Sequence, residues 1–290
     1  MAAISAAYMI VSWFLIGFKP EQLFLVILCN VLFFASMATR NFVISFSVFI
    51  VYWIIFDYMK AFPNYRYHPV HIQSIYNAEK SLFGITMPDG KVVTPNEYWQ
   101  LHQYTALDFM AGLFYLCWIP VPLLFGFYLH LKKRREFFYF AFTFLLVNLL
   151  GFVVYYSYPA AAPWYVSNYG FVFNPATPGN TAGLARFDAL VHAHIFQGLY
   201  TKGSNVFAAM PSLHSAYPII VFYYAVKNKL GYINILFGTV MCGIWFSAVY
   251  TNHHYILDVL AGIGCAIAGI SLFNLIRIKF FPEKKIATAS

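Results

Sequence analysis

Residues 255–276 read YILDVLAGIGCAIAGISLFNLI, a run in which Asp258 is the only charged side chain. A helix needs about 20 consecutive apolar residues to cross a bilayer, so this run has the length and composition of a transmembrane helix. Similar apolar runs recur along the chain, and they do not alternate as the strands of a membrane β-barrel do. The sequence therefore predicts an all-α, polytopic transmembrane helical bundle.

The composition also indicates a membrane protein. Of the 290 residues, 61% are hydrophobic and only 10% are charged, whereas soluble domains carry about 25% charged residues. The net charge of +8 does not indicate a nucleic-acid partner, because the basic residues cluster in short loops, as membrane topology requires. All four cysteines fall in apolar segments, which argues against a disulfide framework or a zinc site. Residues 1–7 carry no basic side chain, so we expect no cleaved signal peptide.

Eight candidate spans follow from the apolar runs. They lie near residues 2–18, 22–38, 42–62, 105–130, 137–158, 207–226, 231–250 and 255–276. These spans divide the chain into N-terminal transmembrane helices over 1–62, a polar segment over 63–104, a transmembrane core over 105–276 and a tail over 277–290.

The distribution of lysine and arginine predicts the orientation in the membrane. Basic residues gather at 132–135 between the fourth and fifth spans, at 227–229 between the sixth and seventh, and at 277–285 after the eighth. With eight spans all three groups fall on one side, which the positive-inside rule makes cytoplasmic. Both termini are then cytoplasmic, and the long polar segments 63–104 and 159–206 are extracytoplasmic.

Two histidine clusters stand out at the extracytoplasmic ends of predicted spans. Residues 210–215 read MPSLHS and residues 253–258 read HHYILD. In the second cluster His254 and Asp258 are four residues apart, so a helix would place them on one face. Ionisable groups at the rim of a lipid-solvated bundle are costly and mark functional sites. We therefore expect His214 of the first cluster to meet this pair in a catalytic site.

These residue types suit phosphoryl transfer without a metal or other cofactor. A nucleophilic histidine oriented by a carboxylate can attack phosphorus, while a second histidine protonates the leaving oxygen. His254 with Asp258 fits the first role, and His214 fits the second. Ser212 and the amides at the start of the sixth span would bind the phosphoryl oxygens. The remaining histidines in polar segments are interpreted as ordinary loop residues: His68, His71, His102, His192 and His194.

The two clusters resemble the second and third motifs of the type 2 phosphatidic acid phosphatase superfamily, whose fold contains a six-helix transmembrane core. Phosphatases of that superfamily have glycine where this chain has Leu213, and a Ser-Arg pair where it has Ser247 and Ala248. Their first motif, Lys-x6-Arg-Pro, is also absent. These departures argue against a simple phosphatase.

Four further stretches resemble a narrower branch, the fungal inositol phosphorylceramide synthases. They read PAAAPWY at 159–165, PGNTAGLARFD at 178–188, FAAMPSLHS at 207–215 and YTNHHY at 250–255. The resemblance implies transfer of phosphoinositol from phosphatidylinositol to the primary hydroxyl of ceramide, with release of diacylglycerol. It assigns His254 as the nucleophile, Asp258 as its orienting carboxylate and His214 as the acid and base.

The missing motif arginine leaves a phosphate-binding role to fill. Arg186 and Lys202, both in the 159–206 segment, are the candidates, and the alternative for Arg186 is a loop ion pair such as one with Asp188. Asn180 and Tyr165 are candidates for shaping the headgroup pocket, together with the glycine at 183.

Two other functions remain open on the sequence alone. A lipid phosphatase or pyrophosphatase of the same superfamily would release phosphate or a phosphorylated headgroup instead of a new sphingolipid. A membrane transporter would place charges near the middle of its spans, whereas here they lie mainly at the span ends. The segment 63–104 is a candidate lid that excludes water, and its Met87–Lys91 stretch is typical of a turn.

Overall fold

Five of the predicted spans are present as long apolar helical segments in the computed structural model, which describes residues 1–200 and 205–280. They are Met37–Ala61, Thr105–Lys132, Arg134–Ser157, Ile233–Tyr250 and Ile256–Phe280. Each has the length and apolar composition needed to cross a bilayer. The chain is therefore an all-α protein of the integral, multi-pass type, apart from one short β-hairpin.

The other three predicted spans are shorter helices. Helices α1 (Ala2–Ile16) and α2 (Pro20–Ala35) are apolar, with 15 and 16 residues, and Gly17 and Pro20 set the break between them. Helix α12 (Leu213–Lys227) also has 15 residues, because the stretch 207–212 that the sequence assigns to this span is irregular. The count of eight full-length spans is thus not established by helix length.

Two helix boundaries differ from those predicted. The span predicted at 105–130 is divided into α6 (Thr105–Leu116) and α7 (Pro120–Lys132), because proline at the first position of α7 favours a helix start over continuation. Helix α14 (Ile256–Phe280) continues four residues into the segment predicted as a tail. Residues 281–290 of that tail lie outside the described part of the chain.

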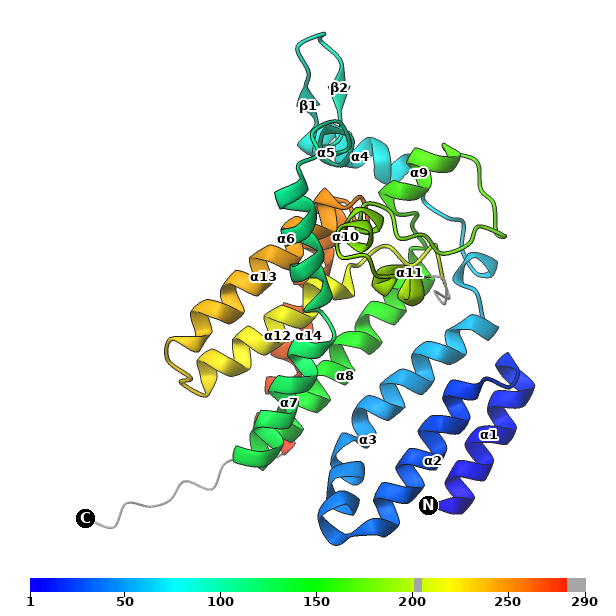
Figure 1. Ribbon diagram of the computed structural model, residues 1–290, viewed down its shortest axis with the longest axis vertical. Helices are drawn as coiled ribbons and strands as arrows, with labels where there is room; N and C mark the ends of the chain where they lie inside the picture. Colours follow the sequence, from blue (N-terminus) through cyan, green and yellow to red (C-terminus); the bar gives the residue numbers. More distant parts are fainter. Residues whose placement is uncertain (201–204, 281–290) are drawn as a thin grey trace.

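The two long polar segments fold into short helices at one end of the bundle (Figure 1). The 63–104 segment holds α4 (Gln73–Phe83), α5 (Pro95–Leu101) and a hairpin of β1 (Ile85–Thr86) and β2 (Val92–Val93). The turn predicted at 87–91 closes this hairpin and is confirmed, since the Met87 amide donates to the Lys91 carbonyl. The described part of the second segment holds three short helices, α9 (Pro163–Tyr169), α10 (Leu184–Leu190) and α11 (Ile195–Tyr200).

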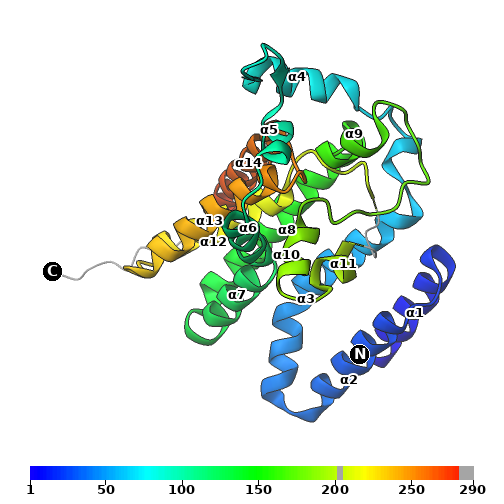
Figure 2. The same ribbon diagram turned by 45° about the horizontal axis from the view of Figure 1, so that its top comes forward.

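The short helices pack on the ends of the long ones. Helix α4 contacts α14, and α5 contacts α13 (Ile233–Tyr250). Figure 2 shows this end of the bundle turned toward the viewer. Helix α10 contacts α6. The polar segments are therefore fixed to the same end of the bundle at which α12 and α14 begin.

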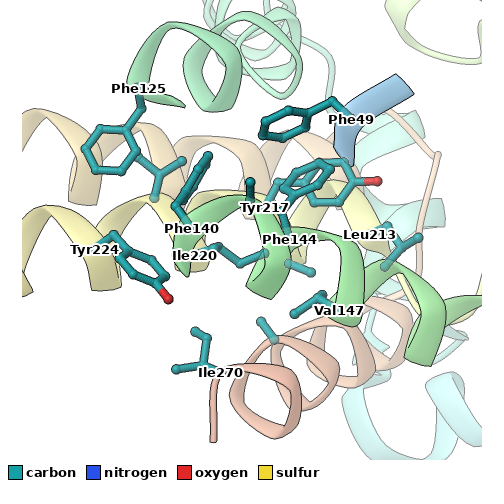
Figure 3. Packing of buried hydrophobic residues seen from close by; sticks show 14 of the residues in the cluster. Phe49, Phe125, Phe140, Phe144, Val147, Leu213, Tyr217, Ile220, Tyr224 and Ile270 are labelled. Carbon is teal, nitrogen blue, oxygen red and sulfur yellow. The ribbon is translucent and has the colours of Figure 1, made fainter. Parts of the chain in front are cut away.

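An aromatic core holds the long helices together (Figure 3). Helix α12 lies against α8 (Arg134–Ser157), where the rings of Phe144 and Tyr217 are 4.6 Å apart. Phe49 of α3 (Met37–Tyr58), Phe125 of α7 and Ile270 of α14 complete this cluster. Helices α1 and α2 lie outside it and pack on α3 (Figure 1).

Helix α14 approaches the start of α12 very closely at Gly262. A Cβ atom built on this glycine would lie 2.1 Å from the Ser212 carbonyl oxygen, well inside van der Waals contact. Only glycine fits there, because the obstructing atom belongs to the backbone and cannot rotate away. Gly264 lies two residues further along the same helix, and a Cβ atom built on it would have no other atom within 4 Å.

We expect Gly262→Ala to destabilise the fold by separating α12 from α14, at a cost of about 1–3 kcal/mol, as for other overpacking changes. The matched control is Gly264→Ala, which adds the same methyl group to open space and should be neutral or slightly stabilising. Thermal unfolding of both variants in detergent tests this contrast. Equal melting temperatures for the two variants would contradict it.

Candidate active site

The two histidine clusters meet where α12 and α14 begin. The Ser212 amide, directly before α12, donates to the Asp258 carbonyl at 2.9 Å. Both residues are fully buried. This single backbone bond joins two stretches that are far apart in the sequence, and it brings together the residues singled out in both clusters.

The imidazoles of His214 and His254 face each other. His254 Nε2 lies 3.2 Å from His214 Nδ1, within hydrogen-bond distance. On its other side, His254 Nδ1 lies 3.5 Å from Asp258 Oδ2, an ion-pair separation that is longer than a good hydrogen bond. His254 is buried, His214 is partly buried, and Asp258 is completely enclosed.

The His254–Asp258 pair arises from a helix terminus and not from the helical face that the four-residue spacing suggests. Helix α14 begins at Ile256, so His254 precedes it. Asp258 lies in the first turn, and its Oδ2 accepts the Tyr255 amide at 2.9 Å. A carboxylate here also complements the positive end of the helix dipole. The same residue thus holds the backbone directly before the helix and faces the imidazole.

A carboxylate on one side of His254 favours the tautomer that carries its proton on Nδ1. Nε2 is then free to act as a base or nucleophile, and it points to the second imidazole. Asp258 Oδ1 has no hydrogen-bond partner within residues 1–200 and 205–280. A buried carboxylate oxygen without a partner is costly, which is typical of a site that carries out chemistry.

Ser212 lies beside these groups, but its hydroxyl already has a neighbour. Its Oγ accepts a hydrogen bond from Ser215 Oγ at 3.0 Å, and the Ser215 carbonyl accepts from the Trp245 indole at 3.0 Å. The amides that follow Ser212 open α12, so this end of the helix attracts anions.

Two positions that differ from the phosphatase pattern have structural explanations. Leu213 is buried against α8, where Gly151 leaves room for it: a Cβ atom on that glycine would lie 2.6 Å from the leucine side chain. Ala248, which stands where the phosphatases have arginine, is fully enclosed in an apolar cluster. Its carbonyl accepts the amides of both His253 and His254, so this position shapes the backbone of the site.

Of the two basic candidates, the structure describes only Arg186. Its Nε forms an ion pair with Asp108 Oδ1 at 2.6 Å, and its guanidinium lies 5.4 Å from the centre of the Tyr250 ring. Arg186 thus forms an ion pair, as the alternative for this residue expected, but its partner is Asp108 and not the suggested Asp188. The Asp188 carboxylate accepts the amides that open α11. Arg186 Nη2 has no hydrogen-bond partner within the described residues. Lys202 lies outside them.

The two headgroup candidates make local contacts. Asn180 Oδ1 accepts the Ala182 amide at 2.6 Å, which forms a turn. The Tyr165 hydroxyl donates to the Val172 carbonyl at 2.7 Å and accepts the Asn174 amide at 2.8 Å. These bonds explain why both residues suit an ordered loop, and their role in binding a headgroup stays a prediction.

The 178–188 stretch docks directly on the turn that carries His254. The Gly183 amide donates to the Thr251 carbonyl at 2.8 Å, and His253 Nε2 lies 2.8 Å from the Thr181 carbonyl. Burial lowers the pKa of His253 to about 3, so this imidazole is neutral at pH 7 and its Nε2–H donates to the carbonyl. His253 therefore has a structural contact and is unavailable as a charged group.

The sequence interpretation missed three side chains that contact the site. The Tyr115 hydroxyl of α6 lies 3.2 Å from His214 Nδ1. Glu79 of α4 and Asn96 of α5 bond to the backbone around His254. No local signal distinguishes Tyr115, which is one of 23 tyrosines. The other two belong to a segment that contains no superfamily motif.

Comparison with known proteins gives a consistent result. A family profile described as the PAP2 superfamily matches residues 94–272. The phosphoinositol dihydroceramide synthase of Bacteroides thetaiotaomicron is 46% identical over 282 residues, covering 96% of this chain and 92% of that protein. The inositol phosphorylceramide synthase of Candida albicans is 30% identical over 149 residues, 50% of this chain and 30% of that protein. The catalytic subunit of the inositol phosphorylceramide synthase of Saccharomyces cerevisiae is 35% identical over 119 residues, covering 40% of this chain and 29% of that protein. No solved structure gave a match.

We expect Leu213→Ala to destabilise the protein, because it leaves a cavity between α12 and α8 beside Gly151; such changes cost about 3 kcal/mol. The matched control is Leu260→Ala in α14, where the leucine is 49% exposed. Thermal unfolding in detergent measures both. A Leu213 variant as stable as the control would show that this leucine is not a packing residue.

Proposed function

Because this chain belongs to the PAP2 superfamily, we propose that it is a phosphotransferase that moves phosphoinositol from phosphatidylinositol to a ceramide-type lipid and releases diacylglycerol. The observation that carries this proposal is the 46% identity to a protein named phosphoinositol dihydroceramide synthase over 96% of the chain. That name favours dihydroceramide over ceramide as the acceptor. The family membership predicted from the motifs is confirmed.

In the first half of the reaction, His254 attacks the phosphorus of the donor lipid. Its Nε2 forms a bond to phosphorus, and the bond from phosphorus to the diacylglycerol oxygen breaks. His214 donates the proton that the leaving oxygen needs, so diacylglycerol departs as a neutral alcohol. The 3.2 Å contact brings the two imidazoles close enough to act on one phosphoryl group, and the rings must separate to admit it.

In the second half, the primary hydroxyl of the acceptor lipid attacks the phosphohistidine. His214 takes the hydroxyl proton, a new phosphorus–oxygen bond forms, and the bond to His254 breaks. The product is phosphoinositol linked to the ceramide-type lipid, and both histidines return to their starting states. Asp258 stabilises the positive imidazole that forms when His254 attacks, since it lies 3.5 Å from Nδ1.

The negative charge on the phosphoryl oxygens must be stabilised by hydrogen-bond donors or cations that keep their protons during the reaction. The amides at the start of α12 and the Ser212 hydroxyl are suitably close to His214. Arg186 supplies a cation from the 178–188 stretch, which contacts the same turn as His254. Lys202 is the second candidate for this role.

We propose that the site lies at the extracytoplasmic face, with both termini in the cytoplasm. The end of the bundle that holds the histidines also holds the polar segments, while the basic residues of the α7–α8 connection lie at the other end (Figure 1). The positive-inside rule makes that other end cytoplasmic. The burial of His254 and Asp258 keeps water from the site, which favours a lipid alcohol over water as the acceptor.

The proposal is tested with purified protein in mixed micelles containing phosphatidylinositol and either dihydroceramide or ceramide. EDTA is present, and mass spectrometry follows the products. We expect a phosphoinositol sphingolipid and diacylglycerol in equal amounts. Release of inositol phosphate or free phosphate with unchanged sphingolipid would favour a phosphatase and overturn the transferase.

We expect His254→Ala and His214→Ala each to abolish turnover without unfolding the protein, because each removes a group that bonds to or protonates a reacting atom. Asp258→Asn should lower turnover by orders of magnitude but not to zero, since it removes only the orienting charge. The matched control is His194→Ala, which removes an exposed histidine. Wild-type rates in either of the first two variants would contradict the mechanism.

Arg186→Gln and Lys202→Gln separate the two phosphate-binding candidates. The residue that binds the donor phosphate should raise the KM for phosphatidylinositol about tenfold or more when neutralised, because a charge-assisted hydrogen bond is worth about 1.5–3 kcal/mol. Steady-state kinetics at varied phosphatidylinositol measure this. Unchanged KM and kcat in both variants would show that neither replaces the missing arginine.

A further inference from the structure

Two side chains of the 63–104 segment bond to the backbone that joins His254 to Asp258. Glu79 on α4 accepts the amides of Ile256 and Leu257, at 2.9 Å to Oε1 and 3.1 Å to Oε2. Asn96 on α5 donates from Nδ2 to the His254 carbonyl at 2.9 Å. The five-residue stretch that carries both groups is therefore fixed by contacts from outside its own helices.

Glu79 serves as the cap of α14. The first amides of a helix have no partner inside it, and a side-chain acceptor normally comes from a residue just before the helix. Here the acceptor comes from a different segment, and each carboxylate oxygen takes one amide. Glu79 is completely buried, and a buried carboxylate is costly unless it forms such bonds.

Asn96 holds the other side of the same turn. It is 1% exposed, and its Nδ2 also donates to the Val249 carbonyl at 2.9 Å. One amide group therefore links the last turn of α13 to His254. Together, Asn96 and Glu79 fix the entry and the exit of the turn between α13 and α14.

We propose that Glu79 and Asn96 are positioning residues for the transfer reaction, which hold the α13–α14 turn so that the Asp258 carboxylate stays against the His254 imidazole. The inference rests on the proposed nucleophilic role of His254. His254 Nδ1 and Asp258 Oδ2 are 3.5 Å apart, already longer than a good hydrogen bond. A small rotation of the turn would separate them further and weaken their interaction. The 63–104 segment thereby supports the chemistry directly, in addition to any role as a lid.

The protonation of Glu79 changes its bonding. Burial is the main cause that raises the pKa of Glu79 to about 7, the Asp258 charge adds to it, and the two backbone amides act in the opposite direction. When protonated, one carboxyl oxygen becomes a donor, so only one amide keeps its acceptor. The other titratable or charged groups around it are Tyr76 and Lys80 on its own helix, Glu97 on α5 and Tyr255 in the turn.

The experiment compares wild type with Glu79→Gln across a range of pH. Glutamine keeps the shape of the side chain but offers only one accepting oxygen, as the protonated carboxyl does. At about pH 8.5 we expect kcat to fall on the order of tenfold with unchanged KM for both lipids, because misplaced catalytic groups slow the chemical step. At about pH 5.5 the ratio of wild-type to variant kcat should approach one, since the wild-type carboxyl is then protonated.

Two further variants separate positioning from general stability. Glu97→Gln neutralises a second acidic residue of the 63–104 segment. Glu97 caps α5 and accepts a hydrogen bond from the Tyr76 hydroxyl. This variant should keep kcat within about twofold of wild type at every pH. Combined with Asp258→Asn, Glu79→Gln should lower kcat little further, because the carboxylate whose position it maintains is already neutral. A purely structural role would give independent, multiplying effects.

Asn96→Ala provides a second test if Glu79→Gln melts at a much lower temperature than wild type. It should lower kcat without changing KM, and its effect should not vary with pH as that of Glu79→Gln does. Suppose that the wild type is active and His254→Ala is inactive. A wild-type kcat in both Glu79→Gln and Asn96→Ala would then overturn this inference alone. A wild type that forms no phosphoinositol sphingolipid would overturn the proposed function and this inference with it.

Discussion

The hydrogen bond from the Ser212 amide to the Asp258 carbonyl is the contact on which the arrangement of the site depends. It is made possible by Gly262, whose missing side chain lets α14 approach the backbone before α12. With the two helix starts joined, the imidazoles of His214 and His254 come to hydrogen-bond distance. The chemistry thus depends on a backbone approach that only glycine permits.

The polar segments supply hydrogen-bond partners for backbone groups that this arrangement of helices leaves unpaired. A site at the start of two helices exposes unpaired amides and carbonyls, which are costly in a buried environment. Glu79 and Asn96 take up those of the α13–α14 turn, and Gly183 pairs with Thr251 beside them. The polar segments therefore complete the hydrogen bonding of the site and hold it rigid. Rigid support of this kind is what the positioning of reacting groups requires.

The sequence predicted the helical class and the meeting of the two histidine clusters, because apolar runs and paired motifs are local signals. Helix breaks were harder to predict: the interruption before Pro120 and the irregular stretch before Leu213 lie inside apolar runs, where hydrophobicity alone does not mark a boundary. The sequence offered Asp188 as an example of an ion-pair partner for Arg186, whereas the actual partner is Asp108, 78 residues away in the sequence. Glu79 and Asn96 were missed for the same reason: their partners are backbone atoms more than 150 residues away.

In the proposed reaction, His254 carries the phosphoinositol group between the two lipids. The most direct measurement mixes the protein with phosphatidylinositol in the absence of acceptor, quenches in alkali, which preserves phosphoramidates, and maps the modified peptide by mass spectrometry. We predict a phosphoinositol adduct on His254 that disappears when dihydroceramide is added before the quench. An adduct on His214 alone, or efficient transfer with no adduct at any time, would contradict the account.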